Sequence, residues 1–237
     1  MSNFNSIKIQ NISKSFNNKL ILDSISCEFM NNQVNVILGK SGTGKSVLLK
    51  ILIGLFEPDS GSLLIDGEEL KNSLSKNDIT MSYIFQSSAL LNSLSVIDNV
   101  TIFLDEHNIG TKDERLSKAY DILTSLGIRD SSDKMPSDLS GGMRKRVAIA
   151  RSLVINPDII LYDEPTAELD PINTKIISKI INDLNSEKSI TQVVVTHDIG
   201  LAYSIADKIS ILDEGKIVIS GDIEEVKKSN NAILNPI

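Results

Sequence analysis

One stretch restricts the fold of this chain more than any other: residues 39–46 are GKSGTGKS and match the pattern G-x-x-x-x-G-K-[ST]. An apolar run at 34–38 precedes it, and apolar residues spaced for one helix face follow it at 46–54. A glycine-rich loop between a strand and a helix can turn successive backbone N–H groups inward, and the helix start adds the positive end of its dipole. The sequence therefore predicts an α/β fold with a phosphate-binding loop.

Two side chains of this loop carry the expected chemistry. Lys45 would bring a full positive charge to the β- and γ-phosphates of a nucleotide, and the Ser46 hydroxyl is a hard oxygen ligand suited to Mg²⁺. A chance match in a glycine-rich turn is the alternative, but it leaves the flanking strand and helix unexplained. No N-K-x-D motif, the usual base-reading motif of GTPases, is present. The predicted nucleotide-binding residues are Gly39, Lys40, Ser41, Gly42, Thr43, Gly44, Lys45 and Ser46.

A second motif is an apolar run, 159–162, that ends in the acids Asp163 and Glu164. Adjacent side chains of a strand point to opposite sides, so the two acids should have different tasks. We expect Asp163 to hold the Mg²⁺ shell and Glu164 to orient or deprotonate the attacking water. An exposed acidic turn before Pro165 is the alternative. Because ligands of open parallel sheets bind at the carboxyl ends of the strands, both motifs are expected at one site.

Composition excludes several classes of protein. The 237 residues carry a net charge of −7, which argues against a nucleic-acid partner because such partners need clustered positive charge. Hydrophobic residues make up 41% and aromatic residues 4%, so we expect an aliphatic core. The single cysteine, Cys27, excludes an intrachain disulfide and a multi-cysteine metal site. Neither a signal peptide nor a run of about 18 apolar residues is visible, so we expect folding in the cytosol.

Hydrophobic periodicity predicts one domain over residues 1–237. Strand-like and helix-like segments alternate in a core of 1–86 and 155–237, whereas an inserted subdomain at 87–154 is mostly helical. The expected strands are two within 1–30 that turn at Asn17–Asn18, then 34–38, 62–66, 81–85, 159–162, 192–196 and a hairpin of 209–212 with 216–220. The expected helices are 46–54, 113–126, 140–154 and 171–185, the last capped by Asp170.

A second anion site is predicted where the helix of residues 140–154 begins. Ser140 can cap the helix, and Gly141 and Gly142 leave the first N–H groups accessible. An ordinary capped helix start is the alternative. One nucleotide does not need both sites from one chain, but two copies placed head to tail would give each nucleotide both. The basic residues of the helix, Arg144, Lys145, Arg146 and Arg151, lie off its apolar stripe.

With these motifs in this order, the sequence resembles the ATP-binding cassette (ABC) family, the motor subunits of ABC transporters. The resemblance covers essentially the whole chain. It implies a P-loop NTPase fold with a RecA-like core, an antiparallel β subdomain and an inserted helical subdomain, and it implies ATP as substrate with Mg²⁺ as cofactor. It also implies that two copies form a nucleotide-sandwich dimer, with Lys45, Glu164 and His197 as the catalytic residues.

The resemblance implies further site residues. Gln86 would contact Mg²⁺ together with Ser46 and Asp163, and Asp170 would lie at the dimer seam. Val47 would complete the nucleotide loop, and Phe16 lies where the family places an adenine-stacking aromatic. The signature residues that would reach the ATP of the opposite subunit are Ser140, Gly141, Gly142 and Met143. As alternatives, Gln86 is an ordinary strand-end residue, His197 a helix-start residue and Phe16 a core residue.

Three segments resemble a narrower group, the ATPase subunits of Mla-type phospholipid transport systems. They are GGMRKRVAIARSL, ILYDEPTAELDPI and SSALLNSLSVIDNV. Met143, where most of the family has glutamine, and Val47 are usual in this group. The resemblance implies an integral-membrane permease, a membrane-anchored lipid-binding protein and a position on the cytoplasmic face of the inner membrane. We expect a permease helix to dock on the Gln86 to Asn99 segment, Leu90, Leu91 and Val96 included, with core packing as the alternative.

Other functions remain open at this point. An importer of amino acids or metal ions would carry the same motifs, since the cassette does not touch the cargo. A soluble ABC ATPase of translation or DNA repair usually has two cassettes or a long coiled-coil insert, and this chain has neither. A non-catalytic nucleotide-gated adaptor would not need Lys45, Asp163, Glu164 and His197. Glu168, where small residues are common in the family, puts the hydrolysis rate in question.

Overall fold

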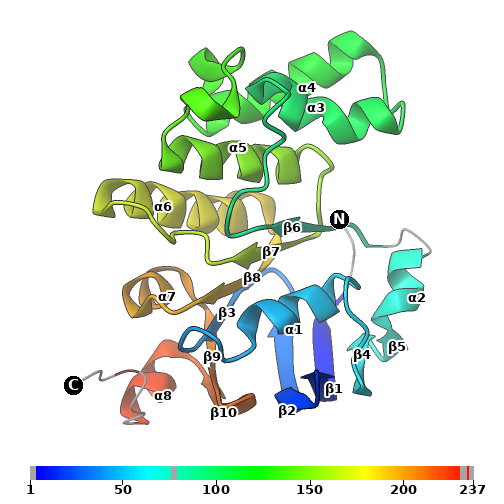
Figure 1. Ribbon diagram of the computed structural model, residues 1–237, viewed down its shortest axis with the longest axis vertical. Helices are drawn as coiled ribbons and strands as arrows, with labels where there is room; N and C mark the ends of the chain where they lie inside the picture. Colours follow the sequence, from blue (N-terminus) through cyan, green and yellow to red (C-terminus); the bar gives the residue numbers. More distant parts are fainter. Residues whose placement is uncertain (1–3, 76–78, 230–233, 235–237) are drawn as a thin grey trace.

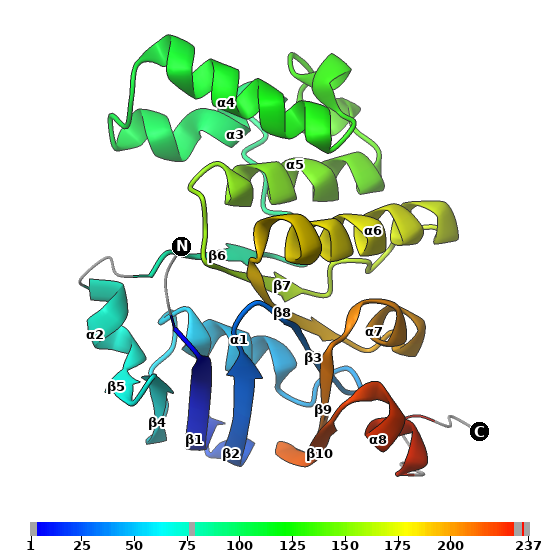
Figure 2. The ribbon, with the colours of Figure 1, turned by 180° about the vertical axis from the view of Figure 1, so that it is seen from behind.

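The protein is built around two β-sheets and a layer of helices (Figures 1 and 2). The computed structural model describes residues 4–75, 79–229 and 234. Within them, a six-stranded sheet lies at the centre in the order β10-β9-β3-β8-β7-β6, and a four-stranded sheet below it has the order β2-β1-β4-β5. The five strands from β9 to β6 pair in parallel, whereas β10 and the whole smaller sheet pair antiparallel.

The elements follow the chain in an order close to the one expected from the sequence. The strands are β1 (Ser6–Phe16), β2 (Lys19–Met30), β3 (Val34–Leu38), β4 (Ser60–Ile65), β5 (Glu68–Glu69), β6 (Met81–Ile84), β7 (Ile159–Asp163), β8 (Thr191–Thr196), β9 (Lys208–Asp213) and β10 (Lys216–Gly221). The helices are α1 (Lys45–Leu52), α2 (Leu70–Ser75), α3 (Val96–Glu106), α4 (Lys112–Ser125), α5 (Gly141–Leu153), α6 (Pro171–Lys188), α7 (Ile199–Ile205) and α8 (Ile223–Lys228), with 3-10 turns at Arg129–Ser131 and Pro136–Asp138.

Local sequence signals set several of these boundaries. Asn17 and Asn18 have positive φ angles of 48° and 61°, which asparagine tolerates, and they make the tight turn between β1 and β2. Asp170 caps α6 by accepting hydrogen bonds from the backbone N–H groups of Ile172 and Asn173. The Asn173 side chain and these backbone groups hold the pKa of Asp170 below its usual range. The helix caps and the hairpin turn are therefore as the sequence predicted.

Strands β3, β7 and β8 of the central sheet are buried on both faces, and their side chains alternate between two hydrophobic cores. Val194 of β8 packs with α5, α6 and the helical layer above, whereas Val193 and Val195 pack with α1 and the smaller sheet below. This is why β7 and the Val193–Val195 part of β8 are continuous apolar runs, whereas side-chain burial alternates along the edge strand β10. Helices α3, α4 and α5 form the layer farthest from the small sheet, and α6 lies between that layer and the central sheet (Figure 2).

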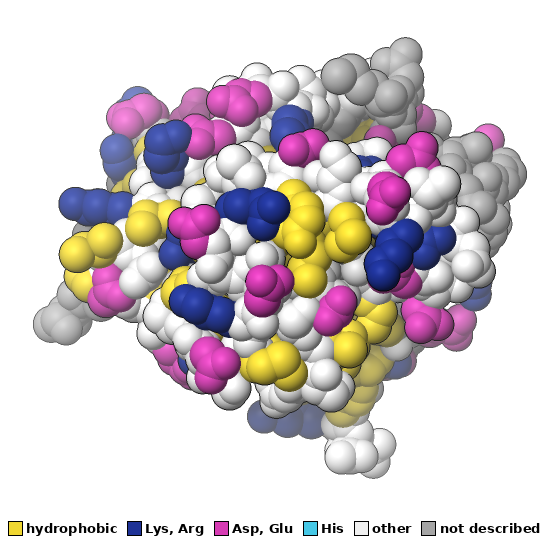
Figure 3. All heavy atoms as spheres, turned by 90° about the horizontal axis from the view of Figure 1, so that it is seen from above, with side chains coloured by type: hydrophobic (Ala, Val, Ile, Leu, Met, Phe, Trp, Pro, Cys, Tyr) yellow, Lys and Arg dark blue, Asp and Glu magenta, His cyan; other side chains and the backbone are white. Residues whose placement is uncertain are grey.

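The face of the helical layer that looks away from the sheets is mixed in charge. Figure 3 shows Lys and Arg side chains dispersed among Asp and Glu, with hydrophobic side chains gathered between them. Among the described residues, no helix is both long enough and apolar enough to cross a bilayer. Cys27 lies on β2, and burial raises the pKa of its thiol to about 12, so the thiol is protonated and a poor nucleophile.

A buried hydrogen bond inside the core above the sheet gives a test of this packing. Tyr162 of β7 is fully buried, its hydroxyl donates to Gln192 Oε1 at 2.9 Å, and Gln192 Nε2 donates to the Ile181 carbonyl at 2.8 Å. Tyr162→Phe would leave the amide oxygen buried without a donor. We expect the free energy of unfolding to fall by about 1–3 kcal/mol, measured by urea unfolding.

The matched control is Tyr203→Phe, because the half-buried Tyr203 ring contacts Lys227 and no hydrogen bond of its hydroxyl is found among the described residues. This variant should unfold within about 0.5 kcal/mol of the unchanged protein. Equal losses in the two variants would contradict the role assigned to the Tyr162 hydroxyl.

Candidate nucleotide-binding and hydrolysis site

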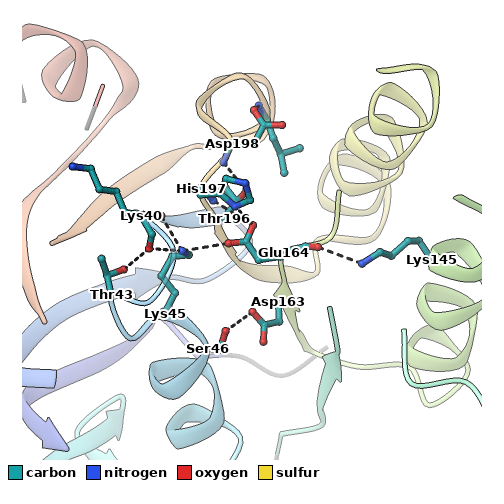
Figure 4. A network of polar contacts seen from close by, with 12 residues as sticks. Lys40, Thr43, Lys45, Ser46, Lys145, Asp163, Glu164, Thr196, His197 and Asp198 are labelled. Atoms are coloured by element: carbon teal, nitrogen blue, oxygen red, sulfur yellow. Dashed lines mark hydrogen bonds and ion pairs between the residues drawn. The ribbon is translucent and has the colours of Figure 1, made fainter. Parts of the chain in front are cut away.

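The candidate site lies where three neighbouring parallel strands end. Strands β3, β8 and β7 are adjacent in the central sheet, and each continues at its carboxyl end into a loop that carries predicted site residues. Strand β3 leads into the loop of residues 39–44, β7 into Glu164, and β8 into His197. Figure 4 shows the side chains from these three loops pointing toward one another. The strand-end geometry expected from the sequence is therefore what brings them together.

The phosphate loop can take its shape only with glycine at certain positions. Gly44 has a φ of 103°, and a Cβ added there would lie 2.7 Å from a methyl carbon of Leu22. A Cβ added at Gly39 would lie 2.4 Å from the Leu212 carbonyl oxygen. The loop therefore packs its backbone directly against β2 and β9. A phosphate group would therefore approach the loop at the N-terminus of α1, which begins at Lys45.

Lys45 is held under the loop by acceptors on two sides. Its side chain is 5% exposed, and Nζ donates to the carbonyl oxygens of Gly39 at 2.8 Å and Lys40 at 3.0 Å. The same Nζ lies 3.3 Å from Glu164 Oε1, so the lysine also pairs with the carboxylate that follows β7. A cation this deeply buried requires such partners, and the pair links the phosphate loop to β7.

Glu164 is oriented by two groups at once. Its second oxygen, Oε2, lies 3.0 Å from His197 Nδ1 and accepts a hydrogen bond from the His197 backbone N–H at 3.3 Å. Its backbone has a φ of 49°, a left-handed conformation that is uncommon for glutamate. A side chain held in this way at a strand end is typical of a functional site.

Asp163 points to the other side of β7, as strand alternation predicted. Its Oδ1 accepts a hydrogen bond from Ser46 Oγ at 2.7 Å, and its Oδ2 accepts one from the Tyr83 hydroxyl at 2.8 Å. Burial, and then the hydrogen bond to Asp163, raise the pKa of Tyr83 above its usual range. A hydroxyl and a carboxylate side by side are hard oxygen donors, the set that Mg²⁺ binds together with phosphate and water. The residues present therefore fit a magnesium site.

The signature segment lies elsewhere in the chain. Ser140 Oγ accepts a hydrogen bond from the Met143 N–H at 3.3 Å, which confirms Ser140 as the cap of α5. A Cβ added at Gly142 would lie 2.0 Å from the Asn173 side chain, so this glycine is needed for close packing on α6. Among the described residues, no hydrogen bond joins residues 140–143 to residues 39–46. The two predicted anion sites are thus not joined by hydrogen bonds within the described part of one chain.

Gln86 and Phe16 lie at the edges of the site region. The Gln86 side chain is exposed just beyond β6. The Phe16 ring is half-buried at the end of β1 and packs edge-to-face on Phe56, with ring centroids 5.4 Å apart. Within the described residues, neither side chain forms a hydrogen bond or an ion pair with Lys45 or Glu164.

The sequence did not predict a buried cation next to Glu164. Lys145 was placed off the apolar stripe of α5, yet its side chain is 5% exposed, and Nζ donates to the backbone carbonyls of Gln86 and Glu164. Burial lowers the pKa of Lys145. Lys145 therefore connects α5, which carries the signature, to the loop after β6 and to the end of β7 (Figure 4). The helical periodicity that defines the apolar stripe of α5 does not indicate that Lys145 contacts these carbonyls.

Arg151 makes a similar contact one to two turns further along α5. Its guanidinium donates to the carbonyls of Ser88 at 3.0 Å and Ala89 at 2.8 Å, two residues with positive φ angles. The loop that follows Gln86 is therefore held in an uncommon backbone conformation by a cation from the signature helix.

Comparison with known proteins identifies the family. The family model described as "ABC transporter" matches residues 22–167, more than half of the chain. The chain belongs to the ABC transporter family. Because ATP hydrolysis is the activity of these cassettes, it is an ABC transporter ATPase, and the P-loop fold expected from the sequence is confirmed.

Several relatives match over nearly the whole chain. The intermembrane phospholipid transport system ATP-binding protein MlaF of Escherichia coli strain K12 is 37% identical over 228 residues, which are 94% of this chain and 84% of MlaF. The probable ribonucleotide transport ATP-binding protein mkl of Mycobacterium tuberculosis strain H37Rv is 36% identical over 97% of this chain. This chain spans 65% of the length of the mycobacterial protein.

A solved cassette shows the same fold. MJ0796, a bacterial ABC transporter cassette solved as a dimer, has a TM-score of 0.82 and 31% identity, with 92% of this chain and 98% of that chain covered. The same cassette has been solved as a dimer in a post-hydrolysis state with ADP and inorganic phosphate, and that structure has a TM-score of 0.81. ABC ATPases, the family to which this chain belongs, bind ATP and ADP.

The buried Lys145 gives a test of how α5 is tied to the site. Lys145→Met keeps an unbranched side chain, shorter by one atom, but removes the donor to the Gln86 and Glu164 carbonyls. We expect the free energy of unfolding to fall by about 1–3 kcal/mol and phosphate release to slow, because two buried acceptors lose their partner. The measurements are urea unfolding and a phosphate-release assay.

Lys112→Met, on the exposed first turn of α4, is the control and should leave both quantities close to those of the unchanged chain. If Lys145→Met behaved like this control, the ammonium would not be holding the two loops.

Proposed function

We propose that this chain is the ATPase subunit of an ABC transporter that moves phospholipid across the cell envelope. The observation that carries the ATPase assignment is the group of Lys45, Ser46, Asp163, Glu164 and His197, gathered at one edge of the central sheet. The phospholipid cargo is supported by the relatives, among which MlaF is named for intermembrane phospholipid transport. The cassette itself does not select the cargo in this proposal.

Two copies of the chain, placed head to tail, would form the working unit. Within the described residues of one chain no hydrogen bond joins the phosphate loop to the start of α5, and in this proposal a nucleotide on the loop meets Ser140 to Gly142 of the second copy. Ile172, one position into α6 from Pro171, is 73% exposed beside Asp170, which suits burial at a dimer seam. The dimers of MJ0796 support the pairing of two copies.

Ser46, Asp163 and Gln86 would hold Mg²⁺ in this site. Ser46 and Asp163 already lie within hydrogen-bond distance of each other, and the Gln86 side chain is exposed nearby in the loop after β6. The ion would neutralise part of the charge that builds up on the β- and γ-phosphates. Phe16 and Val47 belong to the same proposal, Phe16 as the aromatic next to adenine and Val47 as the end of the loop.

The pairing of Lys45 with Glu164 indicates how the site responds to ATP. A γ-phosphate on the loop would draw the Lys45 ammonium away from Glu164 Oε1, because it offers more negative charge than one carboxylate. The freed Oε1 would then accept a proton from water as the water oxygen bonds to the γ-phosphorus. The bond from the γ-phosphorus to the bridging oxygen breaks, its electrons stay with ADP, and inorganic phosphate is released. His197 would keep Oε2 in place and contact the γ-phosphate.

A groove on the outer side of β6 and α3 is the proposed contact with the permease. Its volume is about 320 Å³, and it is lined by Ser82, Tyr83, Ile102, Phe103, Glu106, His107, Arg151, Ser152 and Ile155. Phe103 is 40% exposed, and the buried Ser82 hydroxyl has no hydrogen-bond partner among the described residues. A short amphipathic helix of the permease would cover the ring and offer a polar group to Ser82.

This position differs in part from the one expected from the sequence. Leu91 is exposed and can join the contact, but Val96 is fully buried and Leu90 is partly buried, so these two pack in the core. Work at a permease would place the chain on the cytoplasmic face of the inner membrane, where ATP is supplied. A membrane-anchored lipid-binding protein belongs to the same proposal through the resemblance to Mla-type systems.

The catalytic assignment is tested by Glu164→Gln. Removing the base while keeping the shape should reduce phosphate release by about 10²–10⁴-fold, because a positioned general base contributes that much to the rate. ATP should still bind, and a dimer should accumulate with ATP and Mg²⁺, as measured by size-exclusion chromatography with light scattering. Glu187→Gln, on the exposed end of α6, is the matched control. Normal hydrolysis by Glu164→Gln would contradict the role of the base.

The cargo and the groove are tested together in vesicles that contain the chain and its permease. ATP should drive the movement of a fluorescent phospholipid between membranes or leaflets. Phe103→Ser should abolish this movement and weaken co-purification with the permease, while the nucleotide affinity of the isolated chain stays the same. ATP-driven uptake of amino acids or metal ions in place of phospholipid would show that the chain serves an importer.

A further inference from the structure

The carboxylate of Asp163 is held from both sides, and only one of the two donors belongs to the motifs of the site. Ser46 Oγ donates to Oδ1 at 2.7 Å, and the Tyr83 hydroxyl donates to Oδ2 at 2.8 Å. Tyr83 lies on β6, the edge strand of the central sheet, where it pairs in register with Leu161 of β7. The donor therefore comes from a strand that none of the nucleotide motifs includes.

The aromatic ring of Tyr83 has its own packing, which is independent of the hydroxyl. The ring lies against Phe85 with ring centroids 4.5 Å apart, and it packs on the core below the sheet. Phenylalanine would fill the same space. Compared with phenylalanine, Tyr83 adds one hydrogen bond to the Asp163 carboxylate. This bond goes to Oδ2, whereas Ser46 binds Oδ1.

We propose that Tyr83 is a positioning residue for the magnesium site: by occupying Oδ2 of Asp163, it fixes the carboxylate plane so that Oδ1 stays with Ser46 and faces the nucleotide. This rests on the proposed function, in which Ser46 and Asp163 hold Mg²⁺. A carboxylate on a Cβ can rotate about two bonds, and the strand fixes neither of them. Hydrogen bonds from outside the ligand set commonly orient a metal-binding carboxylate, and their removal weakens metal binding about 10–100-fold.

The test is Tyr83→Phe, which removes the hydroxyl and keeps the ring. The readout is equilibrium binding of a fluorescent ADP analogue titrated with Mg²⁺, so no turnover is needed. We expect the affinity without Mg²⁺ to stay unchanged and the half-saturating Mg²⁺ concentration to rise about tenfold. Phosphate release should show the same shift in Mg²⁺ dependence, with kcat at saturating Mg²⁺ within a few fold of the unchanged chain.

Two further variants separate positioning from packing. Phe85→Leu disturbs the ring contact but keeps the hydroxyl, so its half-saturating Mg²⁺ concentration should not change. In an Asp163→Asn background, Tyr83→Phe should have no further effect on Mg²⁺ dependence, since the hydroxyl acts through the carboxylate.

Three results would overturn the proposal. They are an unchanged or lowered half-saturating Mg²⁺ concentration in Tyr83→Phe, an equal rise in Phe85→Leu, and an additive effect in the Asp163→Asn background. Failure of the proposed function has a different signature, because the unchanged chain would then bind the ADP analogue without any dependence on Mg²⁺.

Discussion

The buried contact between Lys45 and Glu164 is the interaction on which the site depends. It joins the loop after β3 to the end of β7 across β8, and its two partners lie 119 positions apart in the sequence. A buried cation and a buried carboxylate are each costly alone, so the two pair with each other. The loop carbonyls of Gly39 and Lys40 also accept hydrogen bonds from Lys45, and His197 holds the other oxygen of Glu164. The same two groups are the ones that a triphosphate would separate. The pair therefore links the two strand ends in the structure, and in the proposed function it is the contact that ATP changes.

The second constraint is that the helical layer is tied to the site through backbone carbonyls. Lys145 and Arg151 of α5 donate to carbonyls of the loop that follows β6, and Lys145 also reaches the Glu164 carbonyl. A movement of α5, whose first turn is the signature, would therefore change the surroundings of Glu164 directly. The groove beside β6 and α3 adjoins the same loop. In the proposed function, the groove, the signature and the hydrolysis site are therefore connected through the hydrogen bonds of Lys145 and Arg151.

Much of the fold can be predicted from the sequence because apolar runs, helix caps and turn residues are each recognised within a few neighbouring positions. Continuous apolar runs marked β7 and β8, Asp170 and Ser140 marked the starts of α6 and α5, and two asparagines marked the first turn. Short helices such as α7 and α8 carry too few residues for a periodic signal, and no range was predicted for them. The permease segment was predicted partly wrongly at Val96, since an apolar residue in a polar stretch is compatible with docking and with burial alike.

The sequence by itself determined the chemistry: a loop that only glycines can form, a lysine and a serine at its end, two acids after a strand and a capped helix start with two glycines. Each of these is a property of neighbouring residues, so each can be recognised without the fold. Only the tertiary structure decided which groups meet across the sheet. It placed Tyr83 on Asp163, Lys145 under Glu164 and Lys45 between two strands, because these contacts join residues 19 to 119 positions apart and depend on strand order, which local patterns do not encode.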